Sequence, residues 1–511
     1  MVFVKKPAKK KARIVICGNF LDQFSDSSTT NIDAPPLRAL IANGWRKGNC
    51  IGSLDITAAF LHADLPKDRF LIVAPPPCLV ALGVCKPGDL WIVRRALYGL
   101  KESPRYWEDH RDGTLTSLQV SHGGKTYRLF RSEVHHSIWH IYEGTTKHKR
   151  RDPLTLAESP VPLLPTDHSQ APVASIGVYV DDFIWTGPRD MFISFHKAIK
   201  GKFKVGDPDI LGEGECRQLT FLGVTLEVDG KDLLLHQAAY AWSLLERFAE
   251  DLRSQRAVSV PSPTESYQAD APATKDPTVG SANPKKKKKC QQILGALLWL
   301  VTRTRPDIAY AHSRAASFVE GDVDECYTRA VYILRYLVTH PTLGLRYAYF
   351  SGTPSLTIHG DCSWAPTGVA SHEGNVATLN DAVVAWRSKR QQLVAMSSCE
   401  GELIAACQSL IMGRSLRLLV AEMYGTKGVP PPFHMGVDNQ AAIQQITQGE
   451  HATWRSRHIS IRAAAIVSAK QTGELEVGYV KTDQMKADGL TKALTPAVLD
   501  RMRDLWHMVV C

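Results

Sequence analysis

The stretch of sequence that decides the fold runs from Ile176 to Gly187 and reads IGVYVDDFIWTG. Apolar residues that favour β-strands lead up to two adjacent acids and resume directly after them. This pattern predicts a β-hairpin with Asp181 and Asp182 at its tip. Two neighbouring carboxylates repel each other, and a divalent cation such as Mg²⁺, which prefers oxygen ligands, removes the repulsion. A solvated surface turn is the alternative, although such turns more often use Asn-Gly or Asp-Gly.

The Tyr-x-Asp-Asp form of this hairpin, which begins at Tyr179, resembles the catalytic hairpin of reverse transcriptases. A second stretch, Ser53–His62, reads SLDITAAFLH and resembles the first carboxylate motif of the same polymerases. A single Asp at a strand end is usually a turn or a helix cap, so Asp55 gains weight only beside the hairpin acids. The resemblance implies that Asp55, Asp181 and Asp182 together hold two Mg²⁺ ions, with Mn²⁺ as the alternative metal.

A third stretch, Arg94–Trp107, reads RRALYGLKESPRYW and combines basic residues with closely spaced aromatics. Such a surface suits base stacking and phosphate contact. The stretch closely resembles a signature of copia-type retrotransposon reverse transcriptases. The basic run Lys11–Val15 resembles the fingers strand of the same enzymes, whose cations would meet the incoming triphosphate. Which of Lys11 and Arg13 makes that contact stays open, and a disordered basic tail is the alternative. The resemblance implies nucleotide or template contacts by Lys11, Arg13, Phe60, Gly99, Lys101, Arg105, Tyr179 and His458.

For Phe60 we expect a specific role in selecting the sugar of the incoming nucleotide. A strand that turns at Ala58 and Ala59 would place this ring beneath the incoming sugar. The ring would then exclude a ribose 2′-OH by steric clash, so that deoxynucleotides are preferred. A core aromatic is the alternative.

From Leu356 onward the pattern changes to β-rich segments followed by alternating helices and strands. Strands are expected at 356–361, within 376–395, at 433–438 and at 475–480, and helices at 400–423, at 457–469 and from 486 onward. This order resembles the RNase H fold. The resemblance places the metal-ligating acids of that fold at Asp361, Glu402, Asp438 and Asp488.

The motifs around these acids carry the resemblance. The runs GELIA, VDNQAA and ADGLTK begin at Gly401, Val437 and Ala487 and resemble the family's motifs. Glu400 is a rival to Glu402, and the first motif favours Glu402. One departure is Ser363, where copia-type elements usually carry a second Asp.

Length and composition bound the remaining possibilities. At 511 residues the chain should form two to four domains. The net charge of +10 favours a polyanionic partner. The eleven cysteines are odd in number and never form a Cys-x-x-Cys pair, so we expect reduced thiols in an intracellular protein. No apolar run approaches the roughly 18 residues of a membrane span, so no membrane association is expected.

The expected fold class is α+β and multidomain: a right-hand polymerase, a connection segment and an RNase H-like α/β domain. The expected domains are 1–235 for fingers and palm, 236–350 for thumb and connection with a linker near 259–290, and 351–511 for the RNase H-like domain. Residues 144–172 read as an exposed insertion, and helical periodicity returns over 293–349. The run Lys285–Lys289 is expected to be a solvated charge patch, with nucleic-acid binding as the alternative.

By these motifs the chain is identified as a member of the reverse transcriptase–RNase H portion of copia-type LTR retrotransposon Pol polyproteins. The resemblance implies an RNA-directed DNA polymerase that also degrades RNA in RNA–DNA hybrids, with two Mg²⁺ ions in each site. It implies an RNA template, a DNA primer, the hybrid and dNTPs as partners, and leaves the oligomeric state open. The alternative is a truncated or domesticated relic that binds nucleic acid without polymerising. The fingers look short, because the family's domain normally begins a few dozen residues earlier, and this favours the relic, whereas the intact acids oppose it.

Overall fold

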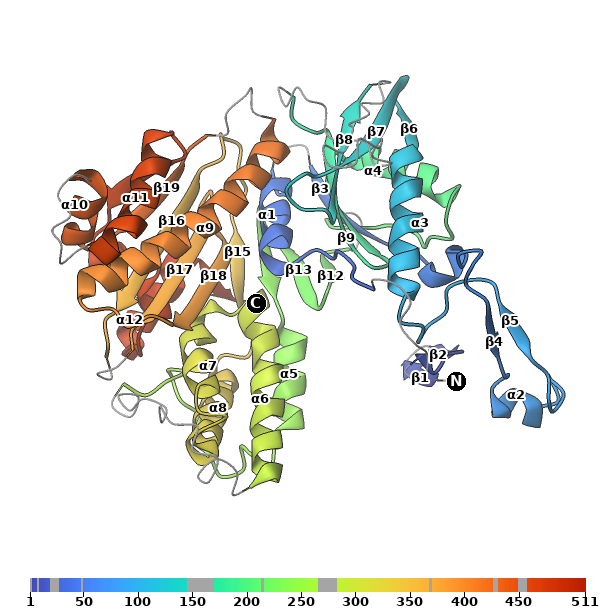
Figure 1. Ribbon diagram of the computed structural model, residues 1–511, viewed down its shortest axis with the longest axis horizontal. Coiled ribbons are helices and arrows are strands. Elements are labelled where there is room, and N and C mark those ends of the chain that lie inside the picture. The colour runs from blue at the N-terminus through green and yellow to red at the C-terminus, as the bar shows by residue number, and fades with distance from the viewer. Residues whose placement is uncertain are drawn as a thin grey trace. The chain divides into compact units, whose positions relative to one another are not determined.

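The computed structural model of the chain describes residues 2–6, 9–18, 27–46, 49–144, 170–212, 216–264, 283–366, 370–425, 431–448 and 457–511. Contacts divide the chain into two units (Figure 1). The first unit is Met1–Ile32 with Ile51–Ile210, and the second unit is Asp33–Cys50 with Leu211–Cys511. The expected insertion and linker lie outside the described residues over 145–169 and 265–282.

The first unit is built on a seven-stranded sheet in the order β11-β3-β10-β9-β8-β7-β6. Its strands are β3 (Cys50–Asp55), β6 (Gln119–His122), β7 (Lys125–Arg131), β8 (Ile138–Glu143), β9 (Ala174–Tyr179), β10 (Asp182–Gly187) and β11 (Asp209–Ile210). The predicted hairpin is confirmed as β9 and β10, in which Tyr179 pairs with Asp182. Helix α3 (Ser103–Ser117) contacts β7, and α4 (Arg189–Lys200) stacks Phe192 on the buried Trp185 of β10.

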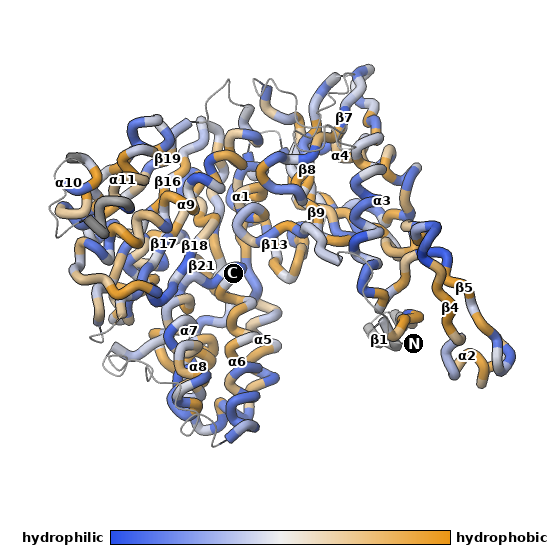
Figure 2. The backbone as a smooth tube through the Cα atoms, viewed as in Figure 1, coloured by the Kyte–Doolittle hydropathy of each residue, from blue (hydrophilic) through white to orange (hydrophobic). Residues whose placement is uncertain are grey.

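Smaller elements complete the first unit. Strands β1 (Val2–Lys6) and β2 (Lys9–Arg13) form one antiparallel hairpin. Strands β4 (Leu71–Val73) and β5 (Trp91–Val93) form a second hairpin, with α2 (Pro77–Ala81) between them. Both strands of the second hairpin are hydrophobic in Figure 2, although Ile72 and Ile92 are half-exposed.

The second unit contains two five-stranded sheets. The first has the order β12-β13-β14-β15-β21 and is antiparallel throughout. Its strands are β12 (Gln218–Phe221), β13 (Val224–Asp229), β14 (Asp232–His236), β15 (Leu343–Tyr347) and β21 (Met508–Val510). This sheet joins strands from three separate parts of the sequence.

The second sheet of this unit is mixed, in the order β18-β17-β16-β19-β20. Its strands are β16 (Leu356–Ser363), β17 (His372–Leu379), β18 (Ala382–Arg390), β19 (Phe433–Val437) and β20 (Leu475–Tyr479). Strands β18, β17 and β16 pair antiparallel with one another, whereas β19 pairs in parallel with both β16 and β20. The strands expected from the sequence are confirmed here, and β16 is central in the sheet.

Helix α9 (Ser398–Tyr424) covers this mixed sheet and contacts β16, β17 and β19 (Figure 1). Its length and composition would suffice to cross a membrane, contrary to the expectation that no segment is apolar enough. However, 61% of its most apolar window is buried inside the protein, so its apolar face serves the core of the second unit. The neighbouring helices are α10 (Gln440–Gln448) and α11 (Arg457–Gln471).

The remaining helices of the second unit are α5 (Ala238–Arg247), α6 (Pro284–Arg303), α7 (Ala309–Ala316), α8 (Val323–Thr339) and α12 (Pro496–Leu505). The helical pattern expected over 293–349 is therefore confirmed up to Thr339. It is wrong from Leu343 onward, because that segment pairs with β14 as strand β15. The last helix is likewise later than expected: a short 3₁₀ turn, η6 (Asp488–Leu490), precedes α12.

Helix α1 (Ala34–Gly44) belongs to the second unit, although it lies early in the sequence. Arg38 is buried and its guanidinium lies 3.9 Å from the ring centre of Trp386 on β18. Its Nε donates to the carbonyl of Val384 at 2.8 Å. Cation–π contact and hydrogen bonding together compensate for burial of this charge.

Candidate metal centres

The first candidate site lies at the ends of two adjacent strands of the first unit. Asp55 is the last residue of β3, Asp181 is in the β9–β10 turn, and Asp182 is the first residue of β10. The backbone N–H of Ile56 donates to the carbonyl of Asp181 at 3.0 Å, which ties the end of β3 to the hairpin turn. The sheet therefore brings together the backbone positions of the three predicted acids.

Negative charge accumulates at this first site. Partial burial, followed by the charges of Asp181 and Asp55, raises the pKa of Asp182 to about 6. A cation held between these carboxylates would relieve both effects. Among the described residues, these three acids do not form a group as tight as the one in the second site.

Phe60 and Arg13 both contact the ring of Tyr98, a residue to which we assigned no role from the sequence. The chain turns at Ala58, whose φ is +57°, into the 3₁₀ turn η2 (Ala59–His62). The Phe60 ring centre lies 5.0 Å from that of Tyr98, and the Arg13 guanidinium lies 5.0 Å from the same ring. Burial, and the charges of Asp181 and Asp55, raise the pKa of the Tyr98 hydroxyl, while Arg13 opposes them. Tyr98 is thus close enough to the acids to feel their charge. Its position inside the Arg94–Trp107 signature is the sequence feature that could have identified it.

The other predicted contacts have varied surroundings. Gly99 has a φ of +90°, and a Cβ there would lie 2.1 Å from the carbonyl oxygen of Ile16, so the residue permits a close backbone approach. Lys101 is exposed, and Arg105 pairs with Asp109 at 3.2 Å. Tyr179 ends β9 and is half-buried. Lys11 and His458 belong to β2 and α11, and their side chains are outside the described part of the chain.

Three further residues, none assigned from the sequence, contact the hairpin turn, and the longest of these contacts is from Arg111 Nη1 to the carbonyl of Val180 at 3.5 Å. The indole N–H of Trp107 donates to the carbonyl of Val180 at 2.7 Å. The side-chain oxygen of Asn31 accepts the backbone N–H of the same residue at 3.0 Å. Trp107 closes the signature stretch, whereas nothing in the sequence marked Asn31.

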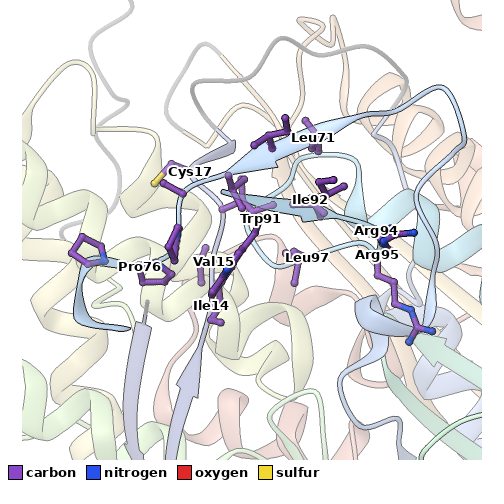
Figure 3. A pocket seen from close by; sticks show the side chains of 17 residues that line it. Ile14, Val15, Cys17, Leu71, Pro76, Trp91, Ile92, Arg94, Arg95 and Leu97 are labelled. Atoms are coloured by element: carbon purple, nitrogen blue, oxygen red, sulfur yellow. The ribbon is translucent and has the colours of Figure 1, made fainter. Parts of the chain in front are cut away.

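An apolar cavity of about 840 Å³ lies between the segment Ile14–Cys17 and the β4–β5 hairpin (Figure 3). Its lining includes Leu71, Pro76 and Trp91, and Arg95 extends away from these side chains. None of the predicted catalytic acids contributes to the lining. The cavity is therefore separate from the acid site.

The second candidate site is a compact group of three acids in the second unit. Asp361 lies on β16, Glu402 on α9, and Asp438 directly follows β19. One carboxylate oxygen from each lies within 4.8 Å of the other two. Asp361 and Glu402 are buried, and Asp438 is half-buried. The structure thus brings together three of the four acids that the sequence predicted for this domain.

Local packing explains why Glu402, rather than Glu400, faces the group. A Cβ at Gly401 would lie 2.7 Å from the sulfur of Cys362, so glycine lets α9 approach β16 closely beside Asp361. Glu400 instead caps the helix: its carboxylate accepts the backbone N–H of Met396 at 2.7 Å. Ser397 is the N-cap, and its hydroxyl accepts the backbone N–H of Glu400 at 3.2 Å, which is one half of a Ser-x-x-Glu capping box.

The electrostatics of the group suit a bound cation. Burial, followed by the charges of Asp361 and Asp438, raises the pKa of Glu402 to about 9. Burial chiefly raises the pKa of Asp361 to about 6, and burial with the charge of Asp488 raises that of Asp438. The Oε2 atom of Glu402 is buried and has no hydrogen-bond partner among the described residues. An orphaned buried oxygen beside two further acids fits a divalent cation.

Asp488, the fourth predicted acid, lies at the start of η6 but outside the group of three. Its carboxylate is 2.5 Å from the ammonium of Lys492, which neutralises it locally. The adjacent Thr491 hydroxyl donates to Asp361 Oδ2 at 2.6 Å. Both Thr491 and Lys492 belong to the ADGLTK motif. The sequence therefore marked these two residues but did not predict their contacts with Asp361 and Asp488.

A family model described as reverse transcriptase (RNA-dependent DNA polymerase) matches residues 2–136. The chain is 27% identical over 480 residues to the retrovirus-related Pol polyprotein from transposon RE1 of Arabidopsis thaliana, which covers 92% of this chain and 28% of the relative. It is 24% identical over 513 residues to the corresponding protein from transposon TNT 1-94 of Nicotiana tabacum, covering 98% of this chain and 34% of the relative. The chain therefore spans about a third or less of the length of these relatives.

One similar solved structure is RNase H1 from the archaeon Halobacterium salinarum NRC-1, with 16% identity and a TM-score of 0.21 over 27% of this chain and 94% of that one. The polymerase match and the hairpin of acids define the chain as one that contains a reverse transcriptase domain. Over most of its length the chain is similar to the Pol polyproteins of copia-type retrotransposons.

Proposed function

We propose that this chain is an RNA-directed DNA polymerase with an accompanying ribonuclease H, each acting by metal-assisted phosphoryl transfer. The observation that carries the proposal is the pairing of two acid sites in one chain, with the polymerase motifs around the first. In each site the acids come from ends of neighbouring elements and carry charge that a cation would stabilise. The intact acids argue against a relic that only binds nucleic acid.

Asp361, Glu402 and Asp438 would hold the metal of the ribonuclease site. Two Mg²⁺ or Mn²⁺ ions bound there would supply Lewis acidity for water activation and leaving-group stabilisation. The chain's own contribution is orientation: Thr491 fixes one oxygen of Asp361, and Gly401 allows Glu402 to reach the group. The proposed substrate is the RNA strand of an RNA–DNA hybrid, recognised by duplex shape and 2′-hydroxyl groups.

Asp55, Asp181 and Asp182 would hold the metal of the polymerase site, where the same chemistry serves the primer 3′-hydroxyl. Phe60, supported by Tyr98, would contact the sugar of the incoming dNTP, and Arg13 would contact its phosphates. We propose a palm formed by β3, β9 and β10 and a thumb that includes α5, α6 and α8. The basic net charge of +10 supports an RNA template and a DNA primer as partners.

The test is a combined assay of the purified chain. With a DNA primer on a labelled RNA template, dNTPs and Mg²⁺ or Mn²⁺, we expect both primer extension and cleavage of the RNA strand. Chelation by EDTA should abolish both activities. Absence of both activities in either metal, from a protein that is folded by circular dichroism, would overturn the proposal.

A further inference from the structure

The catalytic hairpin contains a residue in an unusual backbone conformation. The register pairs Tyr179 with Asp182, which leaves Val180 and Asp181 as a two-residue turn. Val180 has a φ of +51°, in the left-handed region. Hairpin turns usually place Asn, Asp or Gly at such positions, because a β-branched side chain is strained there. Surrounding contacts must therefore hold this turn.

Both backbone polar groups of Val180 are held by side chains from distant parts of the sequence. Trp107 donates its indole N–H to the carbonyl, and Asn31 accepts the N–H, at 2.7 and 3.0 Å. Trp107 is only 1% exposed, and its ring packs edge-on against Phe203 with centres 5.2 Å apart. The indole therefore has little freedom to move away from the turn.

We propose that Trp107 and Asn31 are positioning residues: by fixing Val180 in its strained conformation, they hold the adjacent carboxylates of Asp181 and Asp182 in the geometry that binds metal. This inference rests on the proposed polymerase function of the site. It gives the tryptophan of the Arg94–Trp107 signature a role that base or phosphate contact does not supply. Trp107 acts through the turn and is not a catalytic residue.

The test is a double-mutant cycle with a matched control. Trp107→Phe keeps a buried ring but removes the N–H donor. Trp139→Phe is the control, because Trp139 is fully buried on β8 and its indole nitrogen has no hydrogen-bond partner among the described residues. Val180→Gly removes the strain, since glycine adopts a positive φ freely. Primer extension is measured as kcat, KM for primer–template, and the Mg²⁺ concentration for half-maximal rate.

We expect Trp107→Phe to lower kcat by about tenfold or more and to raise the half-saturating Mg²⁺, because small displacements of reacting groups are costly. KM for primer–template and the control variant should stay within about twofold of wild type. In the Val180→Gly background, Trp107→Phe should lower kcat by less than about threefold, because the turn no longer needs to be held. Additive effects, or an equal loss from Trp139→Phe, would overturn the inference.

A second measurement separates this inference from the proposed function. Urea midpoints of wild type, Trp107→Phe, Val180→Gly and the double variant test the coupling without any activity. We expect Trp107→Phe to lower the midpoint less in the Val180→Gly background than alone. If wild type failed to extend primers while this coupling was present, the proposed function would be wrong and the positioning contact would stand. If the midpoints were additive, the positioning role would be wrong whatever the activity.

Discussion

Replacing Glu402 with Gln should stabilise the metal-free protein. Burial and the charges of Asp361 and Asp438 raise the pKa of this carboxyl from 4.5 to about 9, so the native state keeps it protonated at neutral pH. In the unfolded chain the same group is ionised. Folding at pH 7 must therefore take up a proton, which lowers the free energy of unfolding.

The sign and size follow from that difference in pKa. Because the native pKa is the higher one, the contribution of Glu402 to wild-type stability is largest below pH 4.5 and declines as the pH rises from 4.5 towards 9. Each pH unit in this window lowers it by about 1.4 kcal/mol, which gives about 3 kcal/mol at pH 7. Gln does not titrate, so Glu402→Gln should recover about 3 kcal/mol at pH 7 and almost nothing at pH 4.5.

Urea unfolding of both proteins in EDTA, repeated from pH 5 to pH 8, measures this gap. Glu400→Gln is the matched control: it lies on the same helix, but its carboxylate caps the N-terminus. The control should show no gain in stability that grows as the pH rises, because Gln keeps an oxygen that can accept the same backbone N–H. Added Mg²⁺ should stabilise wild type more than Glu402→Gln, because the variant lacks one ligand charge. A difference in stability between the two proteins that stayed constant or fell with rising pH would show that Glu402 is not protonated in the native state.

Three further predictions concern other parts of the chain. Phe60→Val should increase incorporation of ribonucleotides far more than it alters use of deoxynucleotides, in steady-state assays of matched pairs; equal losses for both sugars would show a packing role. Asp307→Asn should lower the free energy of unfolding by about 3–5 kcal/mol, because it leaves the buried Arg305 guanidinium without the carboxylate 2.8 Å away. A urea midpoint close to wild type would contradict this. Changing Lys287 and Lys289 to Gln should leave the salt dependence of duplex binding unchanged, because both pair with acids of the same unit at 2.7 and 2.8 Å. A log–log slope flatter by about 2 would instead show phosphate contact.

The proximity of the acids could be predicted from the sequence for a physical reason. Asp55, Asp361 and Asp438 each lie at or near the end of an apolar strand, and Glu402 lies in the first turns of a strongly helical segment. Alternation and helical periodicity are local properties, so they fix these elements without knowledge of distant contacts. The resemblance to RNase H motifs then singled out Asp361, Glu402 and Asp438, whose carboxylate oxygens lie within 4.8 Å of one another.

What the sequence could not provide was any feature set by distant pairing. The sequence of β15 continues the helical pattern of the preceding residues, and only its pairing with β14 makes it a strand. Helix α1 leaves the first unit because Arg38 finds its partners near residues 302 and 384. The contact of Trp107 with Val180 joins residues 73 positions apart. Such contacts depend on the assembled sheet, which local propensity does not specify.

A single experiment shows whether one chain carries two chemically separate sites. Wild type, Asp182→Asn and Asp438→Asn are each given a primed, labelled RNA template with dNTPs and Mg²⁺, and DNA extension and RNA cleavage are followed in the same reaction. Asp182→Asn should lose extension and keep cleavage of a preformed hybrid, whereas Asp438→Asn should keep extension and lose cleavage. Loss of both activities in either variant, with the fold intact by circular dichroism, would contradict the existence of two independent sites.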